Sequence, residues 1–227
     1  MKLMSIALVL AVGVSCSSKK KEVKDVDNSE TISRDFEVRD ASSTTRPGWI
    51  EDAEVWVEQE KMDIVKYRYF SFETEPKVNR EIACNLAKAN VRVDIASEIV
   101  TFIQKSLAAS QEGQAAIDAN NPKTQPMREY VSNTMAERVQ SLVNGAAVIK
   151  TYWEKRNYMQ KMGAKKDYVG FTCASLIRME SSRLKAAVDK ASEDLVEKAD
   201  DPETKENVKK ALENLGDDFV KARHGEV

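Results

Sequence analysis

The sequence has few of the residues that common enzyme chemistries require. Its single histidine, His224, lies near the carboxyl end. Histidine-based metal sites and Ser-His or Cys-His catalysis need an imidazole held rigidly in a cleft, so both are nearly excluded. Glycine-rich phosphate loops, Cys-x-x-Cys, His-Glu-x-x-His and Gly-x-Ser-x-Gly are all missing. Since paired carboxylates occur throughout so charged a chain, they indicate no particular site. The sequence therefore predicts a protein that is not an enzyme.

Proline and glycine are also scarce, with five and eight residues among 227. This scarcity favours long helices over a turn-rich all-β design. The length allows one domain with a sizeable core. A formal net charge of −2 gives no reason to expect a nucleic-acid surface.

Only one long apolar run is present, over residues 3–14, after the positive charge of Lys2 and before Ser15 and Cys16. It is too short to span a bilayer, which takes about 20 apolar residues. Its position and flanks are typical of a secretory signal. Residues 1–15 are therefore predicted to be a lipoprotein signal peptide.

Cys16 is the predicted site of lipidation, because the residues before it are similar to a lipobox. Val14 and Ser15 fit that pattern, whereas Gly13 departs from it. Cleavage before Cys16 would leave it with a diacylglyceryl group and an N-acyl chain, and several chains anchor a protein firmly. The alternative is ordinary signal-peptidase cleavage and an unlipidated periplasmic protein. By analogy with enterobacterial sorting, Ser17 in place of Asp favours the outer membrane. No other cofactor is expected.

Residues 16–46 are predicted to form a disordered tether that begins at the lipidated cysteine. Their polar composition buries too little apolar surface to offset the entropy of ordering. As a flexible coil, the tether would have an end-to-end distance of about 30 Å. A weak strand over residues 35–38 stays open as an alternative.

Residues 47–179 are predicted to be an α+β core domain. Period-two and β-branched patterns indicate a small antiparallel sheet of about three strands, at residues 63–74, 146–154 and 167–179. Residues 76–110 are expected to form a long helix with Thr74 as N-cap, and residues 127–143 a second helix. The stretch 111–125 is expected to be a loop with one helical turn.

The long helix carries two apolar stripes. The first consists of Ile82, Leu86, Ala89, Val93, Ala96, Val100, Ile103 and Leu107, and the second of Cys84, Val91, Ile95 and Phe102. The stripes lie about 180° apart at 100° per residue. A helix lying on one sheet needs only one stripe, so the other is covered either by the C-terminal helices or by another subunit.

Residues 180–227 are predicted to form a C-terminal helical extension. Asp200-Asp201-Pro202-Glu203 indicates that one helix stops and another starts, with Asp201 as N-cap and Pro202 at the first helical position.

Several stretches resemble the outer-membrane lipoprotein family typified by a twenty-kilodalton antigen, the LPP-twenty family. They are Pro47-Gly48-Trp49, residues 79–89 (NREIACNLAKA), residues 142–146 (LVNGA) and residues 168–176 (YVGFTCASL). The resemblance covers roughly residues 47–190. It implies helices on one face of a small antiparallel sheet and a role at the membrane surface without catalysis. Related lipoproteins build flagellar rings at the outer membrane.

Cys84 and Cys173 are the two cysteines left once Cys16 is acylated. Export would place them where disulfides persist. Cys84 lies on the long helix and Cys173 on the apolar face of a strand. A disulfide and two buried free thiols are both open at this point.

Two functions follow from these patterns. The first is a non-catalytic lipoprotein, anchored to the outer membrane by its lipid, that binds a protein partner or forms a homo-oligomer, with no nucleic-acid ligand. The second is a periplasmic module that binds peptidoglycan or lipid. Its support is the aromatic stretch with Tyr67, Tyr69, Phe70 and Phe72.

Overall fold

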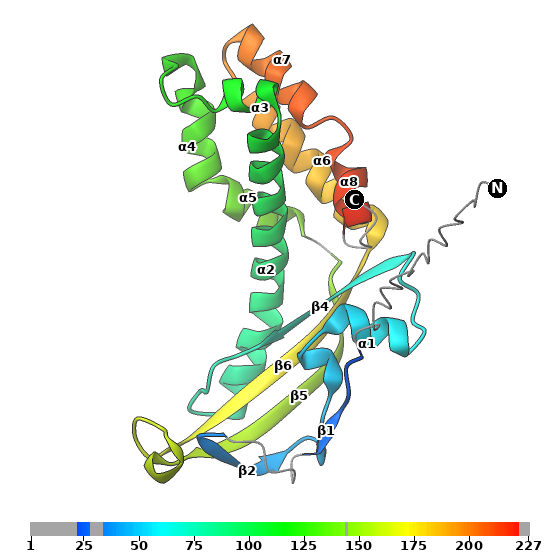
Figure 1. The fold of residues 1–227 in the computed structure, drawn as a ribbon, viewed down its shortest axis with the longest axis vertical. Helices are drawn as coiled ribbons and strands as arrows, with labels where there is room; N and C mark the ends of the chain where they lie inside the picture. Colours follow the sequence, from blue (N-terminus) through cyan, green and yellow to red (C-terminus); the bar gives the residue numbers. More distant parts are fainter. Residues whose placement is uncertain (1–21, 28–33, 144, 223–227) are drawn as a thin grey trace, which may run out of the picture.

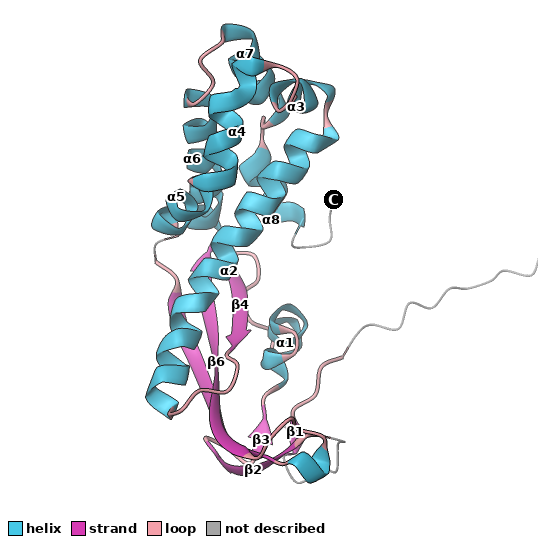
Figure 2. Ribbon diagram, turned by 90° about the vertical axis from the view of Figure 1, so that its left-hand side faces the viewer, coloured by secondary structure: helices cyan, strands magenta, loops and turns pink. Residues whose placement is uncertain are grey.

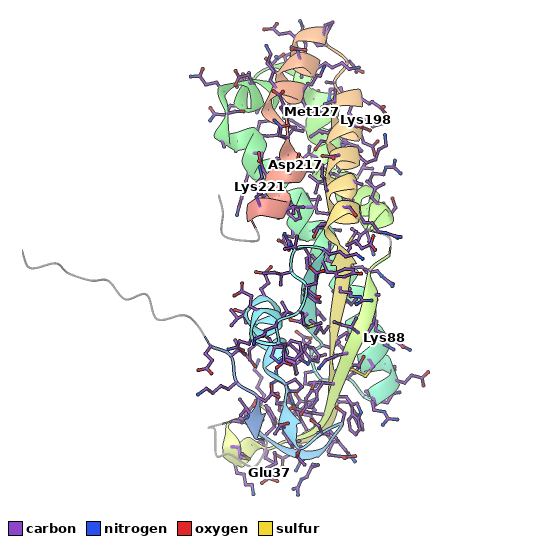
Figure 3. The ribbon with its side chains drawn as sticks, turned by 90° about the vertical axis from the view of Figure 1, so that its right-hand side faces the viewer. Glu37, Lys88, Met127, Lys198, Asp217 and Lys221 are labelled. Atoms are coloured by element: carbon purple, nitrogen blue, oxygen red, sulfur yellow. A yellow bond between two sulfur atoms is a disulfide. The ribbon has the colours of Figure 1, made fainter. Side chains whose placement is uncertain are left out.

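A computed structural model describes residues 22–27, 34–143 and 145–222. The molecule is elongated, with a β-sheet at one end and a group of helices at the other (Figure 1). Figure 3 places Glu37 at the sheet end and Met127 and Lys198 at the helical end. The prediction of an α+β fold is confirmed.

The sheet has four antiparallel strands in the order β2-β5-β6-β4. These are β2 (Phe36–Ala41), β4 (Tyr67–Glu73), β5 (Ala147–Tyr158) and β6 (Tyr168–Glu180). Strands β5 and β6 form the predicted hairpin, with Trp153 opposite Cys173. The short 3-10 helix η3 (Gln160–Met162) and Gly163 turn the chain between them. The φ of Gly163 is 106°, which glycine adopts without steric strain.

The fourth strand corrects the predicted tether. Strand β2 pairs with β5 from Phe36, opposite Tyr158, to Ala41, opposite Glu154. Two shorter strands, β1 (Val26–Asp27) and β3 (Thr45–Arg46), pair with each other. The prediction of disorder is therefore wrong for residues 22–27 and 34–46. The alternative of a strand over residues 35–38 corresponds to β2, at residues 36–41. The polar composition of this segment led to the wrong prediction, because the open edge of β5 supplies hydrogen-bond partners that lie far away in the sequence.

The long helix α2 (Arg80–Ala109) starts later than predicted. Its N-cap is Asn79, whose side chain accepts a hydrogen bond from the backbone N–H of Ile82. Thr74 instead bonds to β6, because its hydroxyl accepts from the N–H of Cys173 at 3.1 Å. The chain after β4 continues alongside β6, because the N–H groups of Thr74 and Lys77 donate to carbonyls of β6 at 2.9 Å each. It runs close to that strand: a Cβ on Gly170 would lie 2.7 Å from Pro76. The prediction that Thr74 caps the helix is therefore wrong.

The two faces of the sheet pack differently. Helix α2 lies along one face, and α1 (Ala53–Gln59) lies near the other (Figure 2). The second face holds a cluster built around Trp49 in the 3-10 helix η1 (Gly48–Ile50), Trp56 in α1, and Tyr69 and Tyr152 in the strands. The N-cap of α1 is Asp52, which accepts from the N–H of Val55.

Short helices surround the C-terminal half of α2. They are α3 (Gln111–Ala116), η2 (Pro122–Thr124), α4 (Gln125–Asn133), α5 (Met135–Leu142), α6 (Ser181–Glu197), α7 (Pro202–Ala211) and α8 (Leu215–Ala222). The helix expected over 127–143 is two helices that meet at Thr134. Asp201 caps α7 as predicted, accepting from the N–H of Thr204 at 3.1 Å. Leu184, Val208 and Phe219 share one core with α2, so the boundary predicted at residue 180 does not separate two cores.

Cys84 and Cys173 are joined by a disulfide, which resolves the choice that the sequence left open. Their Cα atoms are 4.9 Å apart, and 89 positions separate them in the sequence. Ala83 and Ala87, both fully buried, flank the bond and allow the helix to approach β6. The N-terminal half of α2 is thus attached to the sheet covalently and by packing.

We expect loss of this disulfide to lower the free energy of unfolding by about 3 kcal/mol, because a long loop gains freedom in the unfolded chain. The test is urea unfolding of the chain from Ser17 to Val227, with Cys84→Ala/Cys173→Ala beside it. The reduced wild-type chain is the control, and it should lose a similar amount. Two free thiols in the exported protein, titrated under denaturing and non-reducing conditions, would contradict the bond.

Candidate interaction surface

The two apolar stripes of α2 have different surroundings. Cys84, Val91 and Ile95 of the second stripe face the sheet or the core beside it. The first stripe divides at mid-helix. Its C-terminal members Ala96, Val100, Ile103 and Leu107 are buried in the helical core. Intramolecular cover, one of the two predicted options, therefore holds only for that half.

The N-terminal half of the first stripe is exposed. We name Ile82, Leu86, Ala89 and Val93 the α2 stripe. Ile82 is 43% exposed, Leu86 36% and Val93 44%, and Ala89 is also exposed. Exposed single apolar residues are ordinary, but a run of four on one face of a helix makes this surface the candidate interaction site. Val78, which precedes the helix, is 82% exposed.

The arrangement of the elements explains why the stripe is open. The helices that cover α2 gather around its C-terminal half, while the N-terminal half has the sheet on one side only (Figures 1 and 2). Lys88, on this half, lies at the edge of the molecule (Figure 3). Ala83, Ala87 and Val91 occupy the sheet-facing side, and the hydrophobic core clusters of the described residues do not include the α2 stripe.

The aromatic strand does not form an open binding surface. Tyr69 and Phe70 are buried on opposite faces of β4, Tyr69 with the tryptophan cluster and Phe70 with α2. Phe72 and Tyr67 are partly buried and pack against the same two clusters. Core packing accounts for these rings.

A network of four charged side chains lies on the second face of the sheet. Arg46 donates two hydrogen bonds to Glu73, at 2.9 and 2.8 Å. Arg156 donates to Glu73 at 2.7 Å and to Glu154 at 2.6 Å. Glu154 is fully buried and also accepts from the hydroxyl of Tyr152 at 2.9 Å. The positive and negative charges cancel within the network.

The network perturbs the ionisation of its members. Burial alone would raise the pKa of the Glu73 carboxyl. The hydrogen bond from Arg46 and the charges of Arg156 and Arg46 outweigh burial and hold that pKa below its ordinary value of 4.5. Burial likewise opposes the charge of Arg46, but the bond and charge of Glu73 raise the pKa of that guanidinium. A hollow of about 300 Å³ adjoins the network. The network side chains in its lining pair with one another, and Arg34, which also lines it, lies over the ring of Phe36 at 5.6 Å. The network therefore works as a clamp between β3, β4 and β5.

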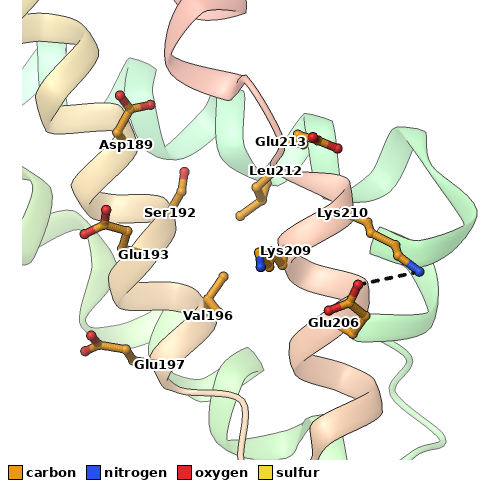
Figure 4. A pocket seen from close by; sticks show the side chains of 10 residues that line it. All are labelled: Asp189, Ser192, Glu193, Val196, Glu197, Glu206, Lys209, Lys210, Leu212 and Glu213. Atoms are coloured by element: carbon orange, nitrogen blue, oxygen red, sulfur yellow. Dashed lines mark ion pairs between the residues drawn. The ribbon is translucent and has the colours of Figure 1, made fainter.

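A hollow of about 740 Å³ lies between α6 and α7 (Figure 4). Val196 and Leu212 supply apolar surface, and carboxylates surround them. Glu193 pairs with Lys190 at 3.1 Å, and Glu206 pairs with Lys210 at 3.7 Å. Because lysines neutralise much of this charge, the hollow offers no distinct chemistry.

The predicted lipidation site, Cys16, lies outside the described residues. Among the residues that are described, no group of His, Cys, Asp or Glu is placed to hold a metal ion. None of the described helices is both long and apolar enough to cross a membrane. The α2 stripe is thus the candidate site that the structure adds, and the burial pattern along α2 was needed to find it.

Comparisons with family models, with curated proteins and with solved structures give no match. The resemblance to the LPP-twenty family therefore stays a prediction.

We expect Glu73→Gln to lower the free energy of unfolding by about 2 kcal/mol at pH 7, because it leaves buried arginine charge uncompensated. Since folding depresses the pKa of Glu73, its stabilisation is present above pH 4.5 and is lost as the pH falls through the folded value. The difference between the two chains should therefore shrink in acid. The measurement is urea unfolding from neutral pH downward, with Glu75→Gln, at a side chain 90% exposed, as control. A constant difference at every pH would exclude this role for the carboxylate.

Proposed function

We propose that this protein is a non-catalytic lipoprotein, anchored to the bacterial outer membrane through Cys16, that acts by protein–protein contact. The α2 stripe is the contact surface. In this function the sheet and the helical end serve as a scaffold that presents one face of α2. The protein works as a subunit of an assembly at the membrane.

The exposure of the α2 stripe is the observation that carries the proposal. One helix uses the same stripe for two purposes: its C-terminal half joins the intramolecular core, and its N-terminal half faces solvent. Apolar side chains in contact with water favour non-specific association. A stripe of them on a rigid helix is therefore typical of a surface that binds a partner. The disulfide on the opposite, sheet-facing side of the helix keeps the backbone of this half fixed, which lowers the entropy lost on binding.

The membrane part of the proposal rests on the first sixteen residues. A positive charge, an apolar run and a small residue before Cys16 are typical of lipoprotein export. The family resemblance supports the same location. An anchored protein meets its partner in two dimensions, where a small contact surface is sufficient.

We expect a photo-crosslinking amino acid in place of Leu86 to trap a protein partner in living cells of the source bacterium. Leu86 lies in the stripe, so the probe would touch whatever covers it. Lys88, on another face of the same half of α2, is the matched control. Adduct formation is read on denaturing gels with an antibody to the chain. Absence of adducts at positions 82, 86 and 93 would contradict the proposal.

We expect Cys16→Ser to abolish metabolic labelling with palmitate and to move the protein from the membrane fraction to the soluble fraction. The physical reason is loss of the thiol that accepts the diacylglyceryl group. Ser18→Ala, two positions away, should leave labelling unchanged. Equal palmitate labelling of the wild type and Cys16→Ser would rule out an anchor at this residue.

A further inference from the structure

The α2 stripe has a spacing that is the same in both directions along the helix. Its members are separated by four, three and four positions: Ile82, Leu86, Ala89 and Val93. At 100° per residue they lie within an arc of about 60°. Such a narrow seam with alternating steps of three and four is the pattern by which two helices pack together.

We propose that the stripe binds the α2 stripe of a second copy of this chain, with the two helices antiparallel and related by a two-fold axis. The inference deepens the proposed function, on which it rests, by naming the partner. The symmetry sets Ile82 of one copy against Val93 of the second copy. It also sets Leu86 of one copy against Ala89 of the second copy, on each side of the axis.

Side-chain size favours the antiparallel direction. In that arrangement, the large Leu86 enters the space above the small Ala89 of the second copy. Helices then approach to the 8–10 Å typical of close packing. A parallel pair in register would place leucine against leucine and alanine against alanine. The leucines would hold the helices apart and leave a gap at the alanines, which costs packing energy.

The charges beside the stripe are complementary under the same symmetry. On one flank, the antiparallel arrangement brings Arg92 of each copy beside Asn85 and Glu81 of the other. All three side chains are exposed in the structure. Neither Glu81 nor Arg92 has an ion-pair partner within the described ranges. Asn90 and Ser97, next to the stripe on the other flank, are polar and uncharged. Asp94, which is exposed and lies further round the helix on that flank, is about 20 Å along the axis from Asp94 of the second copy, so these like charges stay apart.

The size of the surface sets the strength of the contact. Four partly exposed side chains on each copy bury less than the ~1,200 Å² of a standard stable interface. The pair is therefore weak in dilute solution. Anchoring of both copies to one membrane raises their effective concentration towards the millimolar range and makes the contact effective.

The experiment uses the chain from Ser17 to Val227, which retains every described residue and carries no lipid. Sedimentation equilibrium from about 10 µM to about 1 mM should show a monomer that becomes a dimer. Leu86→Glu and Ala89→Lys should each weaken dimerisation at least about tenfold. An equal mixture of the two variants should dimerise again, because the antiparallel pair places the new carboxylate against the new ammonium. Lys88→Glu, on another face, is the control for charge alone.

Cross-linking tests the direction of the pair independently of its strength. Ile82→Cys mixed with Val93→Cys should form a disulfide-linked dimer faster than either variant alone. Circular dichroism and an intact Cys84–Cys173 bond show that each variant is folded. A wild-type chain that is monomeric at 1 mM, or a mixture no better than its single variants, would overturn the pairing. A monomer in solution whose Leu86 probe traps a different protein in cells would overturn the pairing and leave the proposed function standing.

Discussion

The packing of α2 along β6 is the constraint on which the rest of the molecule depends. The helix has 30 residues and is therefore about 45 Å long, enough to join the sheet end to the helical end. Small residues and a disulfide bring its first half close to the strand. Large residues such as Ile99, Ile103 and Leu107 hold the surrounding helices on its second half. Both ends of the molecule take their positions from this one element.

The second face of the sheet is held by different forces. Tryptophan and tyrosine rings bury apolar surface on this face. Directional hydrogen bonds between charged groups are added by the network of Arg46, Glu73, Glu154 and Arg156. Because Arg46 lies in β3, its two hydrogen bonds to Glu73 of β4 attach the β1–β3 pair to the four-stranded sheet. The resulting layers leave the α2 stripe exposed.

The sequence predicts those parts of the fold that depend on local pattern. Period-two alternation found β5 and β6, helical periodicity found α2, and Asp201-Pro202 located the start of α7. What it missed depends on distant partners. Residues 36–41, where the sequence left a weak strand open only as an alternative to a disordered tether, form β2 because β5 has an open edge. Thr74 bonds to Cys173 instead of capping a helix. Periodicity revealed both stripes of α2. It did not reveal where along the helix the surrounding helices stop burying the first stripe. The site therefore came from burial in three dimensions, since the same residue types occur in both halves.

The pairing of β1 with β3 changes how far the protein reaches from its anchor. Asp25, beside β1, accepts a hydrogen bond from the N–H of Gly48 at 2.6 Å, so the fold already includes this part of the chain. From Cys16 to Glu22, the first described residue, a fully extended chain spans only about 20 Å. A lipid on Cys16 would therefore keep the sheet close to the bilayer surface, whereas a disordered tether reaching to residue 46 would allow it to move much further away. The molecule's height above the membrane would then be set mainly by its own rigid length.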